Sequence, residues 1–199
     1  MTIAGVSIVS EAQVNLRDYA AIPISFQVTE RLDRASADLA LIAATLPTLV
    51  VEPPYVKDYD AQPGQHPTQW PRRFNLANGS FAAAFLGEQR IGGAVVIPDA
   101  SADTAVLWDI RVHPAFRNRG VGRALLSFAE SHARARGHRR MQIETQDINV
   151  PASRFYASAG YVLIAINPRA YPDLPDEVQL IWQKHLTASV TFVPQSAQP

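Results

Sequence analysis

The segment Arg117-Asn118-Arg119-Gly120-Val121-Gly122 contains two arginines and two glycines. It lies between a strand-like run and an amphipathic helix pattern. The first turn of a helix leaves its backbone N–H groups without intrahelical partners, and the helix dipole adds positive potential there. Glycine removes the side chain that would keep an anion away from the backbone. The segment therefore predicts a phosphate or pyrophosphate site at the start of a helix.

Two familiar phosphate-binding motifs do not fit this segment. No Lys-Ser or Lys-Thr pair follows Gly122, as a Walker A loop would require. A dinucleotide-binding turn would need an earlier Gly-x-Gly, which is missing, and about 20 positions further on no acidic residue is suitably placed. The segment gains specificity only from the elements around it.

Hydrophobic periodicity predicts the elements that hold this segment. Residues 106–112 alternate as a strand, and residues 121–136 form a helix with Val121, Leu125, Phe128 and His132 along one face. Six prolines predict a long irregular loop over 47–71. The other expected elements are strands at 3–9, 24–29, 81–86, 91–97, 140–146, 161–166 and 178–183, a weak strand at 190–193, and helices at 33–46 and 151–159. This order indicates an α+β fold, a mixed and largely antiparallel twisted sheet flanked by helices.

The composition is that of a globular chain without a charge bias. The 199 residues fit one domain, with 47% apolar residues, 18% charged residues and zero formal net charge, so no nucleic-acid partner is expected. The absence of cysteine excludes thiolate metal sites and a cysteine nucleophile. Neither a signal peptide nor an apolar run of about 20 residues is evident, so we expect a cytoplasmic protein without a membrane partner. The five histidines have no ligand spacing, so no metal is expected.

Residues 81–186 resemble the GNAT superfamily of N-acetyltransferases, which use acetyl-coenzyme A as a co-substrate. The matching stretches are 109–114, 117–122, 143–146 and 149–161. Within the superfamily, the C-terminal half is similar to streptothricin acetyltransferases and related amine acetylators, through 143–146 and the closing segment 176–182. The resemblance implies the acyl-CoA N-acyltransferase fold as a single domain. Its expected parts are an acceptor-side region 1–80, an acetyl-CoA-binding core 81–186 and a tail 187–199.

The resemblance implies a set of cofactor contacts. The pyrophosphate would bind the backbone amides of Asn118, Arg119, Gly120, Val121, Gly122 and Arg123. The side chains of Arg117, Arg119 and Arg123 would add positive charge. The pantetheine arm would pair with the strand edge formed by Ile110, Arg111 and Val112. Asn149 would bond the pantetheine amides, and a plain helix N-cap is its equally weighted alternative.

Two proton transfers are needed for acetyl transfer to an amine, and the resemblance offers a residue for each. Tyr156 occupies the general-acid position that protonates the departing thiolate; the alternative is a core tyrosine with a satisfied hydroxyl. Glu144 is the candidate base, acting directly or through water, and Asp109 on the neighbouring strand is its competitor. A reaction without a dedicated base is the third option.

The acceptor is the least defined part. The leading hypothesis is a small-molecule amine, such as a cationic antibiotic, acetylated by direct transfer in a ternary complex. Its pocket is expected from 55–60, 70–74 and 167–177, which carry aromatic and acidic residues. One rival is a protein N-terminal or lysine acetyltransferase, and another is a non-catalytic acyl-CoA-binding module. A homodimer is compatible with the resemblance.

Overall fold

The computed structural model describes residues 3–12, 15–33, 45–73, 75–99 and 103–186. Its elements, with η for short 3-10 helices, are β1 (Val6–Glu11), α1 (Leu16–Ala20), β2 (Phe26–Leu32), β3 (Thr48–Lys57), η1 (Pro67–Arg72), η2 (Leu76–Asn78), β4 (Ser80–Leu86), β5 (Gln89–Pro98), β6 (Thr104–Val112), η3 (Pro114–Phe116), α3 (Val121–Ala135), β7 (Arg140–Gln146), α4 (Val150–Ser158), β8 (Val162–Asn167) and β9 (Gln179–His185). None of the helices in this described part has the length and apolar character needed to cross a bilayer.

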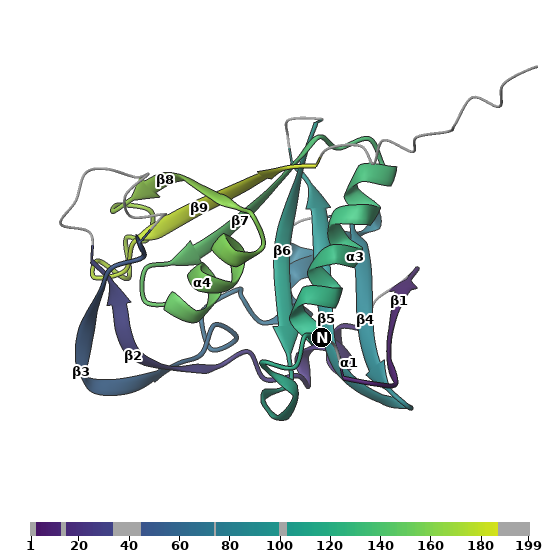
Figure 1. Ribbon diagram of the computed structural model, residues 1–199, viewed down its shortest axis with the longest axis horizontal. Helices are drawn as coiled ribbons and strands as arrows, with labels where there is room; N and C mark the ends of the chain where they lie inside the picture. Colours follow the sequence, from purple (N-terminus) through teal and green to yellow (C-terminus); the bar gives the residue numbers. More distant parts are fainter. Residues whose placement is uncertain (1–2, 13–14, 34–44, 74, 100–102, 187–199) are drawn as a thin grey trace, which may run out of the picture.

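Seven strands form one mixed sheet in the order β1-β4-β5-β6-β7-β9-β8 (Figure 1). All neighbouring pairs are antiparallel except β6 and β7, which are parallel and are joined through α3. A parallel pair requires a crossover connection, and α3 supplies it. The predicted α+β class and the strand–helix–strand unit at its centre are confirmed.

The parallel pairing of β6 and β7 is short. It runs from Thr104 opposite Arg140 to Leu107 opposite Ile143, only four residue pairs. Beyond this point β6 continues along β5 to Val112, whereas β7 continues along β9 to Gln146. The two strands therefore diverge, and the β7-facing edge of β6 beyond Leu107 has no strand beside it.

Helix α3 packs one face against the sheet and lies in front of β4, β5 and β6 in Figure 1. Its fully buried apolar side chains recur at helical spacing, which fits the predicted amphipathic pattern. They are Val121, Leu125, Leu126, Ala129 and Ala133. Phe128 and His132, predicted on this face, are half-buried at its border, with their rings stacked 6.1 Å apart.

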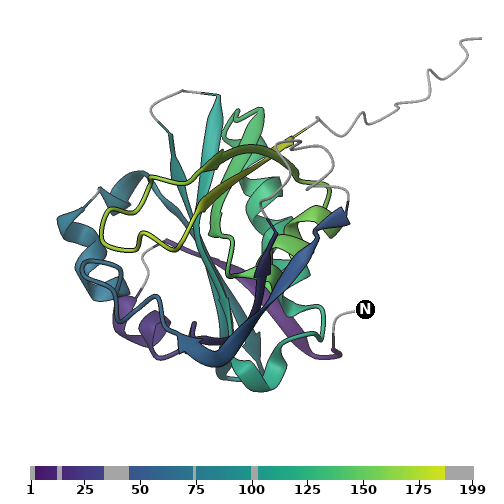
Figure 2. The same ribbon diagram turned by 90° about the vertical axis from the view of Figure 1, so that its left-hand side faces the viewer.

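The ribbon of β2 and β3 corrects the predicted irregular loop over 47–71. Residues 48–57 form a strand, β3, antiparallel to β2, whereas 67–72 form η1. The prolines misled the prediction because Pro53 and Pro54 fall in a bulge between the ladder positions Val50 and Tyr55, where strand hydrogen bonds are not required. This ribbon and the loop between β8 and β9 lie on the same side of the molecule (Figures 1 and 2).

Most other predicted elements appear with shifted ends. The hairpin of β4 and β5 and strand β7 match their predictions closely, and α4 begins one residue earlier than expected. Helix α1 was not predicted, because its five residues are too few to show a period. The predicted helix at 33–46 falls largely, and the weak strand at 190–193 entirely, outside the described residues.

Candidate active site

The start of α3 has the backbone geometry that an anion site requires. Gly120 is the N-cap, with a left-handed φ of 82°, and it has no side chain that could cap the helix. Asn118 also has a positive φ, 60°, so the chain turns sharply just before the helix. The N–H groups of the first turn are therefore left for another acceptor, and a pyrophosphate fits this arrangement.

The arginines near this turn have different partners. Arg117 donates to the carbonyl oxygens of Val112, Ser25 and Pro23, at 2.9–3.0 Å. Its side chain therefore ties the loop to the chain between α1 and β2. Arg123 donates to the backbone oxygen and hydroxyl of Ser158 in α4. Arg119 is exposed at the turn.

Next to this turn, the open edge of β6 presents alternate backbone groups. His113 donates its N–H to Ile91 on β5, so by the alternation of a ladder Arg111 also turns toward β5. Ile110 and Val112 then turn toward the open side. The Val112 carbonyl already accepts from Arg117. The groups left for an extended ligand are the Ile110 backbone and the Val112 N–H.

The side chain of Arg111 belongs to a buried ion-pair network. Its five N–H donors bond Asp60 twice, Asp109 twice and the carbonyl of Ile22 once, at 2.8–3.3 Å. Burial lowers the pKa of Arg111, but the two carboxylates more than offset this, so its pKa is raised. The predicted cofactor contact of Arg111 can therefore come only from its backbone. Its side chain fixes the segment at Asp60 to β6.

Asn149 has the helix N-cap geometry that was its alternative interpretation. Its Oδ1 accepts the N–H of Ala152 at 3.2 Å, in the first turn of α4. Its Nδ2 donates to the hydroxyl of Tyr59 at 3.2 Å. One N–H of the side-chain amide remains for a pantetheine group, so capping and cofactor contact are compatible.

Tyr156 lies in α4 and is 5% exposed. Its ring contacts Phe155 and meets Tyr161 edge-on at 5.8 Å. Burial and the nearby charge of Asp109 raise the pKa of Tyr156, which keeps the phenol protonated. Its hydroxyl has no hydrogen bond to any other residue in the described part of the chain. This is the state that a proton donor needs.

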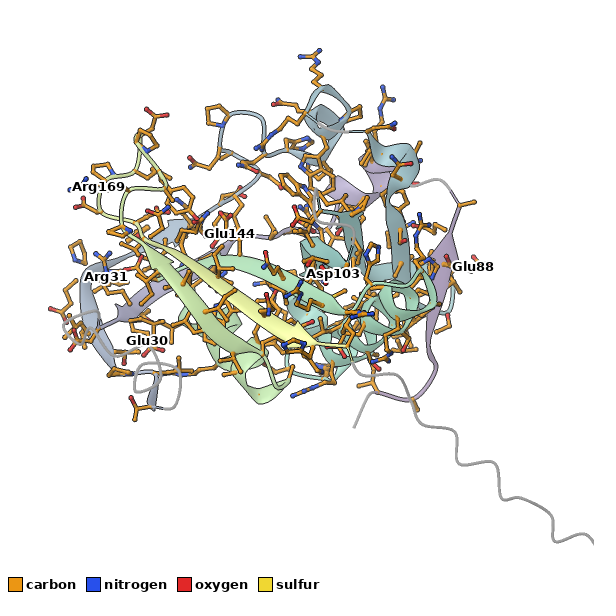
Figure 3. The ribbon with its side chains drawn as sticks, turned by 90° about the horizontal axis from the view of Figure 1, so that it is seen from above. Glu30, Arg31, Glu88, Asp103, Glu144 and Arg169 are labelled. Atoms are coloured by element: carbon orange, nitrogen blue, oxygen red, sulfur yellow. The ribbon has the colours of Figure 1, made fainter. Side chains whose placement is uncertain are left out.

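Glu144 projects from β7 and is exposed, next to the loop that carries Arg169 (Figure 3). Its two oxygens accept from the hydroxyl of Tyr171, at 2.7 Å, and from the side-chain amide of Gln179, at 2.8 Å. A carboxylate accepts several hydrogen bonds at once, so these contacts orient Glu144 and leave capacity for water or an amine.

Asp109, the competing candidate base, accepts more hydrogen bonds from the protein than Glu144 does. It accepts from Nε and Nη2 along one edge of the Arg111 guanidinium and from the Tyr19 hydroxyl, at 2.5–3.0 Å. Its side chain is only 8% exposed. These contacts give Asp109 a structural role and leave Glu144 as the more accessible carboxylate.

Two of the three segments expected around the acceptor meet in the structure. Lys57, at the end of β3, forms a buried ion pair with Glu177, which precedes β9. Tyr59 lies next to both: the Lys57 ammonium is 5.9 Å from its ring centroid, and the charges of Glu177 and Glu144 contribute to its raised pKa, behind burial as the main cause. The third segment is different, because Trp70 packs in a small core with Tyr19.

Sequence reasoning named the ranges around Tyr59, Tyr171 and Glu177 but not the contacts between these residues. Lys57 and Glu177 are 120 positions apart, and Asn149 and Tyr59 are 90 apart. No local pattern reports such a pairing. The available clue was composition alone, a gathering of tyrosines and carboxylates in two irregular segments. In the part of the chain that the structure covers, no three His, Asp or Glu side chains are grouped to hold a metal ion.

A mixed sheet in which β6 and β7 diverge beside the N-terminus of the crossover helix defines the acyl-CoA N-acyltransferase fold. Residues 48–161 match the model of the acetyltransferase (GNAT) family. The chain belongs to this family, which confirms the resemblance inferred from the loop before α3 and the segments that follow it.

The chain is also similar to individual proteins and solved structures that are named as acetyltransferases. Streptothricin acetyltransferase A of Bacillus subtilis (strain 168) is 31% identical over 106 residues, covering 52% of this chain and 61% of that protein. A candidate streptothricin acetyltransferase from Bacillus anthracis str. Ames, solved with acetyl coenzyme A, superposes with a TM-score of 0.73 at 27% identity. That superposition covers 90% of this chain and 98% of the other. The [ribosomal protein bS18]-alanine N-acetyltransferase of Haemophilus ducreyi (strain 35000HP / ATCC 700724) is 28% identical over 64% of this chain and 88% of that protein.

Proposed function

We propose that this protein transfers the acetyl group of acetyl-coenzyme A to a primary amine of a small cationic molecule. The observation that carries the proposal is the open edge of β6, which leads from the unpartnered N-terminus of α3. An extended pantetheine arm can pair with such an edge as an added strand does. The solved relative that holds acetyl coenzyme A supports the same donor.

The proposed chemistry uses one proton acceptor and one proton donor. The acceptor ammonium loses a proton to the Glu144 carboxylate, directly or through water, and the free amine attacks the thioester carbonyl carbon. The C–S bond then breaks as Tyr156 gives its proton to the departing thiolate sulfur. The new amide nitrogen loses its second proton, which restores the Tyr156 phenol directly or through water. The charge of Glu144 contributes to the raised pKa of Tyr59, whose hydroxyl accepts from Asn149 at the start of the helix that carries Tyr156, which supports a common site for the two transfers.

The acceptor class follows from the charge and the rings around Glu144. The carboxylates of Glu144 and Glu177 carry two negative charges, and the Lys57 ammonium neutralises only one of them. The rings of Tyr59 and Tyr171 lie near these groups. Such a site favours cationic small molecules. The names of the curated relatives support streptothricin as the first compound to test.

The proposed function is tested by thiol release from acetyl-coenzyme A with a panel of streptothricin, simple amines, amino acids and peptides. We expect release with streptothricin or another small amine, and a product heavier by one acetyl group in mass spectrometry. The Tyr156→Phe variant, with the same purification, is the matched control for trace contaminating activity. Coenzyme A binding without thiol release across the panel would instead support a non-catalytic binding module.

A second candidate, acetylation of a protein N-terminus, is favoured by the ribosomal-protein acetyltransferase relative. It predicts thiol release with peptides that begin with alanine and none with small amines. The same panel therefore decides between the two acceptor classes.

A further inference from the structure

Glu177 is a buried carboxylate with a hydrogen-bond partner at only one of its two oxygens among the described residues. The residue is 8% exposed, and its Oε1 is bound by the Lys57 ammonium. Its other oxygen, Oε2, is buried and has no hydrogen-bond partner among the residues described. A buried charged oxygen without a partner is costly, so a ligand that donates to it would be bound with a gain.

The charge of this carboxylate acts on three tyrosines. Behind burial, which is the main cause, the charge of Glu177 contributes to raising the pKa values of Tyr55, Tyr59 and Tyr171. The Tyr59 ring already has one ammonium, that of Lys57, 5.9 Å from its centroid. Aromatic faces together with a carboxylate are a common means of binding an alkylammonium group.

The free oxygen is also next to the proposed reaction site. Tyr171 bonds Glu144 through its hydroxyl, and the charges of both Glu144 and Glu177 act on Tyr171. Tyr59 is in turn bonded by Asn149 and coupled electrostatically to Tyr156. Lys57, Tyr59 and Tyr171 therefore connect Glu177 to the groups assigned to acetyl transfer, but Glu177 has no role in the proton transfers.

We propose that Glu177, which shares Lys57 with Tyr59 and lies in the same loop as Tyr171, binds a second ammonium group of the acceptor, so that the preferred substrates are diamines. An ammonium suits the site better than a guanidinium, because only one carboxylate oxygen is left and a planar fork needs two. This inference rests on the proposed function, since it concerns the amine that is not acetylated.

The test compares matched acceptors in the wild-type protein. Each α,ω-diaminoalkane of a series is paired with the monoamine in which a methyl group replaces the distant amine. We expect kcat/KM for the best diamine to exceed that of its monoamine by about tenfold, the factor that about 1.4 kcal/mol of differential binding produces. The advantage should shrink at about 1 M salt, where the Debye length is about 3 Å.

Glu177→Gln should remove this preference. The ratio of kcat/KM for the diamine to kcat/KM for its monoamine should fall about tenfold, a split between the two acceptors that a purely structural role would not produce. Asp173→Asn is the matched control, because it neutralises an exposed carboxylate of the same loop. It should retain the diamine preference.

Equal kcat/KM values for matched acceptors in the wild-type protein would overturn the proposal, and this measurement does not depend on the folding of any variant. An equal loss on both acceptors in Glu177→Gln would also overturn it. Either result leaves the proposed function intact as long as amines are acetylated. The absence of thiol release with every acceptor tested would reject the proposed function itself.

Discussion

Tyr156 combines burial with a hydroxyl that bonds no other residue in the described chain. Buried tyrosine hydroxyls usually find a partner, so an unpaired hydroxyl is available to a ligand. Tyr161, whose ring touches it, offers a neighbour with the same chemistry for comparison. The pair separates the function of a hydroxyl from its place in the core.

Tyr156→Phe should lower kcat by roughly 10²-fold, within the range that general-acid catalysis contributes, with little change in the KM of acetyl-coenzyme A. Steady-state thiol release with a confirmed acceptor measures both quantities. Tyr161→Phe is the matched control and should retain kcat within about twofold. Unchanged turnover in Tyr156→Phe would remove Tyr156 from the mechanism.

The pH dependence should reflect the protonated state of Tyr156. Burial and Asp109 raise its pKa above the usual value of about 10, so the phenol keeps its proton at and below that pH. As pH rises from 6, kcat/KM should therefore increase while the acceptor ammonium deprotonates, without a decline before about pH 10. Rate profiles of the wild type and Tyr156→Phe test this. A decline near pH 8.5 that only the wild type shows would contradict the assignment.

At the level of elements, the close contact of α1 with the sheet depends on one glycine. A Cβ at Gly93 on β5 would lie 2.5 Å from a ring carbon of Tyr19. The hydroxyl of that tyrosine bonds Asp109, and its ring faces the Arg111 guanidinium at 4.9 Å. The tyrosine therefore cannot move without disturbing the network on β6.

Gly93→Ala should destabilise the protein by about 1–3 kcal/mol, the usual cost of overpacking a core. Thermal or urea unfolding monitored by circular dichroism measures the change. If the cause is the Tyr19 ring, Gly93→Ala combined with Tyr19→Leu should lose less than the sum of the two single variants. Strict additivity would show that the clash is not the cause.

Helices and strands could be predicted where apolar and polar residues recur at a regular spacing, and they were missed where no such spacing is present. Strand β7 alternates apolar and polar residues, and its predicted bounds are those observed. Strand β3 carries two prolines in a bulge, which made it look like a loop. For the candidate site, the resemblance named single positions, namely the loop before α3, Glu144 and Tyr156, and their roles stay predictions. The Lys57–Glu177 pair could not be predicted, because it arises only from folding.

At the scale of the whole molecule, Arg111 joins three parts of the chain. Its side chain, which is 1% exposed, holds Asp109 on β6, Asp60 after β3 and the carbonyl of Ile22 after α1. A buried cation shared by two carboxylates is costly to remove, because both negative charges are then left without their partner.

Arg111→Met should destabilise the protein by about 3–5 kcal/mol, as expected when one member of a buried ion-pair network is removed. The free energy of unfolding in urea measures this. Arg154→Met, which removes an exposed ion pair with Glu30, is the control and should cost no more than about 1 kcal/mol. Similar losses in the two variants would contradict the role given to the Arg111 network.

The four-pair ladder between β6 and β7 means that the sheet is continuous in backbone hydrogen bonds only at one end of its centre. A bound pantetheine arm would restore that continuity at the other end and act as a missing strand. The amide protons of Ile110 and Val112 should then exchange with deuterium quickly in the free protein and at least about tenfold more slowly with coenzyme A bound. The amide of His113, already bonded to Ile91, should change much less and serves as the internal reference. Hydrogen–deuterium exchange followed by NMR makes the comparison, and equal slowing of all three would point to general stabilisation instead of a repaired sheet.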